Sequence, residues 1–326
     1  MSMQSDRAVR ICCALSTALW MALSGSVVHA DVRVVQVSAR MAALGTDLQV
    51  GDVLATSSGS SLTLQRFRQL EWTDAQSAPV ALQRQREGQW QSVSLPAGEW
   101  AVDVVEVDAL PDAATFDLAN AAHRESQLRE RWQQTYQLSM PSAAWGIALM
   151  RELARHGKAT EIQTLLPDVF AVASEAERVA VLYAVHSALT PQALLEWTRK
   201  AQASATVAND PALVNLTILA YAQLRDLSAT ESTATALFSD QADNLWGMRA
   251  ALALALNAFR QHDHAQAEAW LAKAEALAAR IAPTGLDTAN AQVLRGVIDE
   301  RLGRSSGMAT LEGGLQRLRM LDPNSA

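Results

Sequence analysis

The feature that most constrains the fold is a change in the spacing of apolar residues along the chain. Between residue 31 and about residue 107, apolar side chains alternate or occur in short bursts, which is typical of β-strands. From about residue 112 onward they recur every three to four residues, the period of an amphipathic helix. We therefore expect an α+β fold that is mostly α, with a small β-rich part followed by a long helical part.

The first thirty residues have the pattern of a secretory signal peptide. Arg7 and Arg10 precede an apolar stretch over residues 11–23, and Ala30 suits a cleavage site. The stretch is shorter than the roughly 20 residues that cross a bilayer, which makes an uncleaved anchor the less favoured alternative. Both cysteines lie inside it, so the product after cleavage has none. Arginine outnumbers lysine and alanine is abundant, as in high-GC bacteria. We expect a periplasmic protein without membrane insertion after cleavage.

Residues 31–110 contain short apolar segments separated by turn signals such as Gly51-Asp52 and Glu87-Gly88. These segments predict strands, and they begin near Val32, Val53, Val80, Val93 and Trp100. One short helix is expected among them around Leu64, Phe67 and Leu70, with Ser61 or Thr63 as its N-cap.

This β-rich part resembles a PDZ domain of the bacterial type. The matching pieces are the opening strand over residues 32–37, the Gly-Asp turn within residues 48–54, the short helix, and the hairpin over residues 80–89. The resemblance covers about a quarter of the chain. In the PDZ family an extended peptide adds as a strand to a sheet edge beside the helix. The resemblance therefore implies a peptide-binding groove, which would be lined by Val34, Val35, Val37, Leu64 and Phe67.

The sequence departs from the PDZ pattern at its start. The opening strand follows directly after the predicted cleavage site, so the strand and glycine-bearing loop that hold a peptide's C-terminal carboxylate in that family are missing. Two interpretations stay open: a functional peptide groove, or a truncated domain that serves only as a packing cap for the helices.

The helical part shows start and stop signals at regular intervals. We expect a connecting helix over residues 111–141 and a helical array over residues 142–326. Candidate N-terminal caps are Ser174 to Glu177, Thr190-Pro191, Asp210-Pro211, Ser228 to Glu231 and Asp263 to Gln266. Turns are expected near Gly157, Pro191, Asp226, Asp263 and Gly303, which lie 34 to 40 residues apart. This spacing predicts a helix-hairpin repeat.

Residues 251–279 resemble a tetratricopeptide repeat. The match consists of Leu254, Ala255 and Ala258 in the first helix and Ala267, Leu271 and Ala274 in the second. Small residues are needed at these positions because the helices approach closely. The unit lacks the aromatic positions of the family, and its proline arrives late, at Pro283. The resemblance implies an α-helical hairpin solenoid whose concave face holds a polypeptide. Most tryptophans of the chain are expected to pack within or between repeats.

Three patterns invite an enzymatic or metal-binding interpretation, and each lacks the context that it needs. Ser305 lies in a G-x-S-x-G sequence, but a predicted helix precedes it and no histidine follows His264. His262 and His264 flank Asp263, a predicted N-cap, and do not share a helix face. The acidic residues at 103, 106, 108 and 112 lack the spacing and central glycine of a calcium loop. We expect no catalytic residue, no metal and no cofactor.

The net charge of −7 argues against a nucleic-acid partner, because phosphate binding needs a basic surface. The sequence favours an exported, non-enzymatic interaction or scaffold protein that binds a protein or peptide through the helical array, with the PDZ-like groove as a further site. The alternative is a stand-alone regulatory or sensory module that controls a separately encoded periplasmic or envelope enzyme. A hydrolase that uses Ser305 is a third, less favoured possibility. The oligomeric state stays open.

Overall fold

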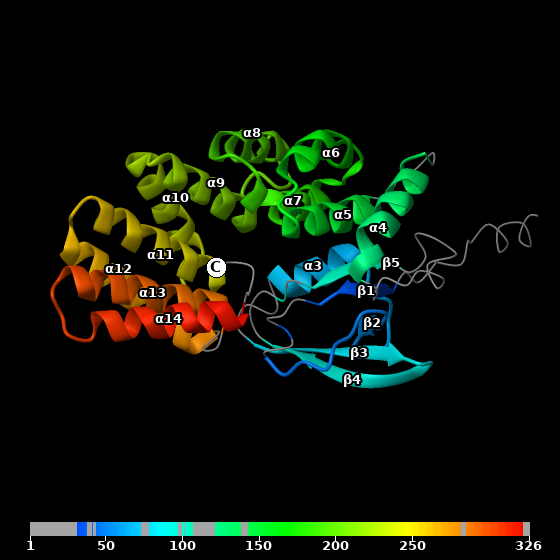
Figure 1. Cartoon of the computed structure of the whole chain (residues 1–326), viewed down its shortest axis with the longest axis horizontal. Helices are drawn as coiled ribbons and strands as arrows, with labels where there is room; N and C mark the ends of the chain where they lie inside the picture. The colour runs from blue at the N-terminus through cyan, green and yellow to red at the C-terminus, as the bar shows by residue number, and fades with distance from the viewer. Residues whose placement is uncertain are drawn as a thin grey trace, which may run out of the picture.

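The computed structural model describes residues 31–37, 41, 44–72, 78–96, 100, 102–106, 121–137, 143–281 and 285–321. The predicted signal peptide and the segment 107–120, which includes Asp108 and Asp112, lie outside these ranges. The protein has an α+β fold that is mostly α, in which a small antiparallel sheet precedes a helical array (Figure 1). This confirms the predicted fold class.

The sheet part contains β1 (Val32–Gln36), β2 (Val53–Thr56), α3 (Leu64–Trp72), β3 (Val80–Arg86), β4 (Gln89–Leu95) and β5 (Asp103–Glu106). The helices that follow are α4 (Ala121–Tyr136), α5 (Ala143–Arg155), α6 (Ala159–Val172), α7 (Glu175–Val185), α8 (Pro191–Gln202), α9 (Pro211–Leu224), α10 (Leu227–Asp240), α11 (Leu245–Arg260), α12 (His264–Ile281), α13 (Leu286–Arg301) and α14 (Gly307–Leu321). Helix α4 lies within the range predicted for a connecting helix. No helix in the described ranges is both long enough and apolar enough to cross a membrane.

The strand order in the sheet is β4-β3-β2-β1-β5, and every neighbouring pair is antiparallel. Strand β1 lies inside the sheet, since Val32 is opposite both Leu54 of β2 and Glu106 of β5. Strands β3 and β4 form a hairpin through the two-residue turn Glu87-Gly88, whose φ angles of 51° and 79° are those of a type I′ turn. The two edges of the sheet are therefore β4 and β5.

Two local predictions in the sheet part are confirmed, the turn at Gly51-Asp52 and the N-cap at Thr63. The buried Asp52 carboxylate accepts the backbone N–H of Gln49 at 2.8 Å, and it also accepts Nε and Nη2 of Arg86 at 2.7 and 2.8 Å. These bonds fasten the turn before β2 to strand β3. Thr63 is the N-cap of α3, because its hydroxyl oxygen accepts the backbone N–H of Arg66 at 3.2 Å.

The helical array contains five hairpins among the described residues: α5/α6, α7/α8, α9/α10, α11/α12 and α13/α14. Four of the five predicted turn residues lie between the two helices of one hairpin, and the fifth, Pro191, is the first residue of α8. Ser174 and Glu177 form the predicted capping box at α7, and Thr190 and Asp210 cap α8 and α9. Asp263 accepts the N–H of Gln266 at the start of α12.

The capping box predicted at Ser228 to Glu231 is wrong. Helix α10 begins at Leu227, and Asp226 is its N-cap, with its carboxylate accepting the N–H of Ala229 at 3.0 Å. Arg225 ends α9 in a left-handed conformation with a φ of 59°. Asp226 directly follows this left-handed residue and is the first residue that can act as the N-cap of α10. Ser228 therefore lies inside α10.

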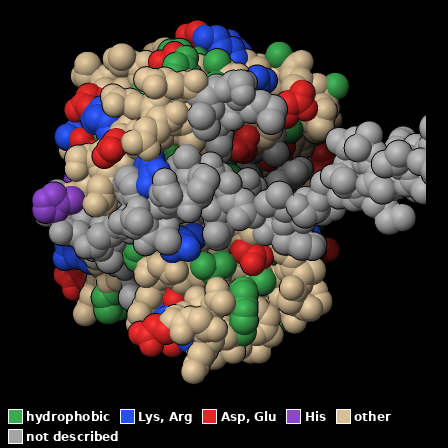
Figure 2. Space-filling view, turned by 90° about the vertical axis from the view of Figure 1, so that its right-hand side faces the viewer, with side chains coloured by type: hydrophobic (Ala, Val, Ile, Leu, Met, Phe, Trp, Pro, Cys, Tyr) green, Lys and Arg blue, Asp and Glu red, His purple; other side chains and the backbone are tan. Residues whose placement is uncertain are grey.

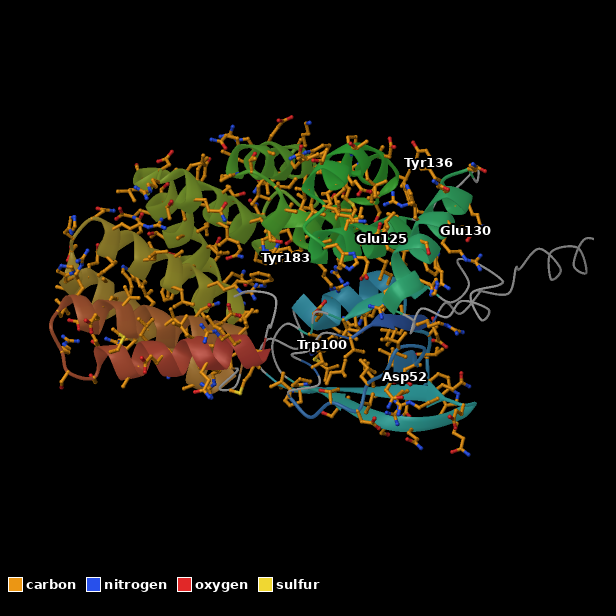
Figure 3. The ribbon with its side chains drawn as sticks, viewed as in Figure 1. Asp52, Trp100, Glu125, Glu130, Tyr136 and Tyr183 are labelled. Atoms are coloured by element: carbon orange, nitrogen blue, oxygen red, sulfur yellow. The ribbon has the colours of Figure 1, made fainter. Side chains whose placement is uncertain are left out.

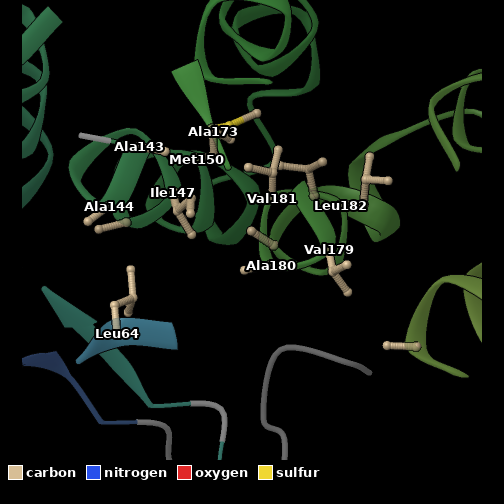
Figure 4. Close-up of a cluster of buried hydrophobic side chains, with 14 of the residues drawn as sticks. Leu64, Ala143, Ala144, Ile147, Met150, Ala173, Val179, Ala180, Val181 and Leu182 are labelled. Carbon is tan, nitrogen blue, oxygen red and sulfur yellow. The ribbon is translucent and has the colours of Figure 1, made fainter. Parts of the chain in front are cut away.

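The first helices of the hairpins, α5, α7, α9, α11 and α13, contact one another in order and form an inner layer (Figure 1). The sheet part packs on the start of this layer, with α3 against α7 and β5 against α5. Figure 4 shows Leu64 of α3 beneath Ala144 and Ile147 of α5, with Ala180 of α7 beside them. All four are buried, and one continuous hydrophobic core runs from the sheet into the array.

In the last hairpin, glycines inside the helices allow α13 and α14 to approach each other closely. A Cβ at Gly296 of α13 would lie 2.4 Å from the backbone nitrogen of Leu311 in α14. A Cβ at Gly307 of α14 would lie 2.4 Å from the backbone nitrogen of Glu300 in α13. The two backbones therefore approach each other at points where only glycine fits.

Candidate functional site

The structure places most of the predicted groove residues in the core. Val34 and Phe67 are fully buried, and Leu64 is 5% exposed. The ring of Phe67 packs against Trp100 with 5.4 Å between their centroids. Val37 is half-buried, and the side chain of Val35 lies outside the described residues. Val34, Leu64 and Phe67 therefore belong to the hydrophobic core between the sheet, α3 and the array, and they do not line an open groove.

Strand β5 occupies the edge of β1 to which, by the PDZ resemblance, a peptide adds. Arg33 is opposite Val105 and Val34 is opposite Val104, while the other side of β1 pairs with β2. Strand addition needs unpaired backbone groups, so a peptide would have to displace β5 from β1. We therefore place no peptide at β1. The packing of α3 on the array accords with the alternative interpretation of a domain that packs against the helices.

A chain of contacts, here called the inner seam, links four successive inner helices. Its members are Tyr183 of α7, Asn215 of α9, Trp246 and Arg249 of α11, and Asp287 of α13. Asn215 donates from Nδ2 to the Tyr183 hydroxyl at 3.0 Å, and the rings of Tyr183 and Trp246 meet edge-on with centroids 6.2 Å apart. Arg249 lies 5.2 Å from the Trp246 ring centroid. It also donates to both carboxylate oxygens of Asp287 at 3.1 and 3.0 Å.

The inner seam fixes the register of the repeats. The side chains of Arg249 and Asp287 are only 12% and 15% exposed, and their two parallel bonds make the pair stronger than an ordinary surface ion pair. Figure 3 shows Tyr183 on the side of α7 that faces the sheet part. The sequence predicts that most tryptophans pack within or between repeats, as Trp246 does, and it singles out none of the other four members. The repeat spacing predicts which helices are neighbours, but it does not specify which side chains meet.

The second helices of the hairpins form an outer layer, which carries a repeated aromatic arrangement. Phe170 of α6 packs on Trp197 of α8 with centroids 4.9 Å apart, and the Lys200 ammonium lies 4.1 Å from the Trp197 centroid. The same arrangement recurs in α10 and α12 with Phe238, Trp270 and Lys273. In both cases the lysine follows the tryptophan by three residues. The ring pairs bridge successive outer helices, and this is the packing role expected for these tryptophans.

A charged cluster joins α4 to the first hairpin. The Glu125 carboxylate accepts Lys158 Nζ at 2.7 Å, His156 Nδ1 at 3.1 Å and Arg129 Nη2 at 3.1 Å. These partners lower the pKa of Glu125 from its ordinary 4.5 to about 2, with the Lys158 bond as the largest cause. Charges of both signs are interspersed over the face in Figure 2. The cluster holds α4 on the array and presents no single-sign patch.

The sequence patterns that invite catalysis lie in turns. Ser305 is exposed in the loop between α13 and α14, so a helix precedes it where a nucleophile elbow needs a strand. His262 adopts a left-handed φ of 63° in the turn before α12. Within the described ranges, no three His, Cys, Asp or Glu side chains come together as metal ligands. The hollows on α8 and α4 are shallow and open, the first one lined by Leu195, Glu196 and Arg199.

Comparison with protein-family models, curated proteins and solved structures finds no match. The PDZ and tetratricopeptide resemblances therefore remain proposals that rest on the residues quoted for them.

Proposed function

We propose that the protein is an exported scaffold, without enzymatic activity of its own, that binds a polypeptide on the inner layer of its helical array. One observation carries this proposal: α5 and α7 of that layer already hold a helix and a strand of the same chain, α3 and β5. The inner layer is thus able to bury polypeptide of either secondary structure. Helices α9, α11 and α13 continue the same layer.

The inner seam supports a preorganised surface on this layer. Its contacts lie largely beneath the surface, since Trp246 is 2% exposed and the Arg249 side chain is 12% exposed. These contacts join α7, α9, α11 and α13, and a preorganised surface loses less entropy when it binds. The signal-peptide pattern supports export, and the resemblance of residues 251–279 to a tetratricopeptide repeat supports a polypeptide ligand. No described surface favours the regulatory alternative.

Site-specific photo-crosslinking in cells that produce the protein tests the proposal. A photoreactive amino acid at Leu256 lies two turns after Arg249 on the same face of α11, at a half-buried position. The matched control is the same group at Gln192, exposed on the outer face of α8. We expect a discrete crosslinked protein from the Leu256 position and none from Gln192. Equal products from both positions, or no product from Leu256, would overturn the proposal.

A further inference from the structure

Strand β4 is an open edge of the sheet. The strand order leaves β3 as its neighbour within the described part of the chain. Figure 1 shows it on the side of the sheet that points away from the array. All seven residues pair with β3 in one uninterrupted register, from Val80 with Leu95 to Arg86 with Gln89. Within the described part of the chain this edge is therefore regular, and six of its seven residues are at least partly exposed.

This edge lacks the features by which proteins prevent strands from pairing with other chains. Its sequence, QWQSVSL, contains no charged residue and no proline, and its ladder contains no bulge. The opposite edge differs in its charge, its length and its register. Strand β5 has four residues, carries Asp103 and Glu106 at its ends, pairs with β1 through an irregular register, and packs against α5. The same sheet thus protects one edge and leaves the other open.

The hairpin geometry identifies the backbone groups that face outward. In a hairpin closed by a two-residue type I′ turn, the residues that flank the turn, here Arg86 and Gln89, form a hydrogen-bonded pair. Hydrogen-bonded and non-bonded pairs then alternate along an antiparallel ladder. The N–H and C=O groups of Trp90, Ser92 and Ser94 therefore point away from β3. Trp90 is also 46% exposed, a large apolar side chain beside the free edge.

We propose that β4 pairs antiparallel with β4 of a second copy of this chain, about a two-fold axis through Ser92. This is the symmetric register that pairs all seven residues of the strand. The opposed pairs are Gln89 with Leu95, Trp90 with Ser94, Gln91 with Val93, and Ser92 with Ser92 of the second copy.

The absence of charge on β4 and the length of β4 favour a second copy of this chain as the partner at this edge. A strand without charges meets no like charge when it pairs with itself, and the two strands match in length. A charged foreign peptide would find no complementary charge on β4. The pairing forms about six backbone hydrogen bonds. It buries less than the roughly 800 Å² per partner of a standard interface, so we expect a weak dimer that forms at micromolar concentrations.

Sedimentation velocity over about 1 to 200 µM on the chain as cells produce it tests this dimer. Ser92→Pro removes one outward N–H and leaves the β3 ladder intact, because that N–H does not bond to β3. Ser92→Ala is the matched control that keeps the N–H. We expect the parent and Ser92→Ala to dimerise alike, and Ser92→Pro to raise the dissociation constant at least about tenfold. Unchanged thermal unfolding of Ser92→Pro shows that the fold is retained.

A charge swap tests the register. Ser92→Lys and Ser92→Glu each place like charges opposite each other across the two-fold axis, so each variant alone is expected to stay monomeric. An equimolar mixture is expected to form a heterodimer. A parent that stays monomeric over the whole range, a dimer that survives Ser92→Pro, or a mixture that does not associate would each overturn the proposal. The first outcome would leave β4 open for a foreign strand. None of these outcomes bears on binding at the inner layer.

Discussion

The substitution Gly296→Ala tests the claim that α13 and α14 are joined by close backbone contact. The new Cβ would lie 2.4 Å from the nitrogen, 2.6 Å from the Cα and 2.7 Å from the Cβ of Leu311. Ordinary contacts between such atoms are about 3.5 Å or longer, so α14 has to move away by about 1 Å. The atoms in the way belong mainly to the α14 backbone, and no side-chain rotation relieves the clash.

Two opposing effects set the magnitude. Overpacking of this kind costs about 1–3 kcal/mol. Alanine in a helix interior is in turn more stable than glycine by about 0.5–1 kcal/mol, because glycine loses more backbone entropy on folding. The net expectation for Gly296→Ala is a loss of about 1–2 kcal/mol in the free energy of unfolding.

Gly313→Ala is the matched control in the same hairpin. A Cβ there would lie 3.0 Å from Nε2 of Gln292, the far end of a flexible side chain that can swing aside. We expect this variant to be neutral or to gain up to about 1 kcal/mol. Urea unfolding measures both variants, and hydrogen exchange of α13 and α14 shows whether the loss is local. If Gly296→Ala proved as stable as Gly313→Ala, the close approach of the two helices would be refuted.

Three further predictions follow from the contacts above. Arg249→Ala leaves the nearly buried carboxylate of Asp287 without its partner and should lower the free energy of unfolding, measured with urea, by about 1–3 kcal/mol. Lys200→Ala, on the exposed outer face, should lower it by at most about 1 kcal/mol. The lowered pKa of Glu125 stabilises the fold above its ordinary value of 4.5, and this contribution is lost as the pH falls from about 4.5 toward about 2. The unfolding free energy of the parent should therefore drop by on the order of 1 kcal/mol more than that of Glu125→Gln over this range, and equal pH profiles would contradict the assignment. Asp226→Ala should destabilise α10 by about 1 kcal/mol while Ser228→Ala changes little, as thermal unfolding of the two variants would show.

Local signals in the sequence determined much of the fold. The shift from a period of two to one of nearly four separated the sheet from the array, and proline, glycine and capping residues located every hairpin turn. The error at Ser228 arose because two capping patterns overlap within a few residues. The left-handed conformation of Arg225, which decides between them, has no sequence signature.

Nonlocal partners determined what the sequence did not predict. The sequence of β1 alone is compatible with an edge strand. Its second side is paired only because β5, about seventy residues later in the chain, lies next to it in the sheet. The ion pair between Arg249 and Asp287 joins residues 38 positions apart. Such contacts depend on how helices rotate against one another, which the spacing of apolar residues constrains only coarsely.

The inner layer as a polypeptide-binding surface is the central claim, and crosslinking in cells that produce the protein tests it most directly. The decisive quantity is the yield of a discrete crosslinked protein from Leu256 relative to Gln192, measured in the parent chain and in Arg249→Ala. We predict a product from Leu256 alone, and a lower yield of it when the inner seam is broken. Equal yields from the two positions, or a product that is unaffected by Arg249→Ala, would contradict the claim.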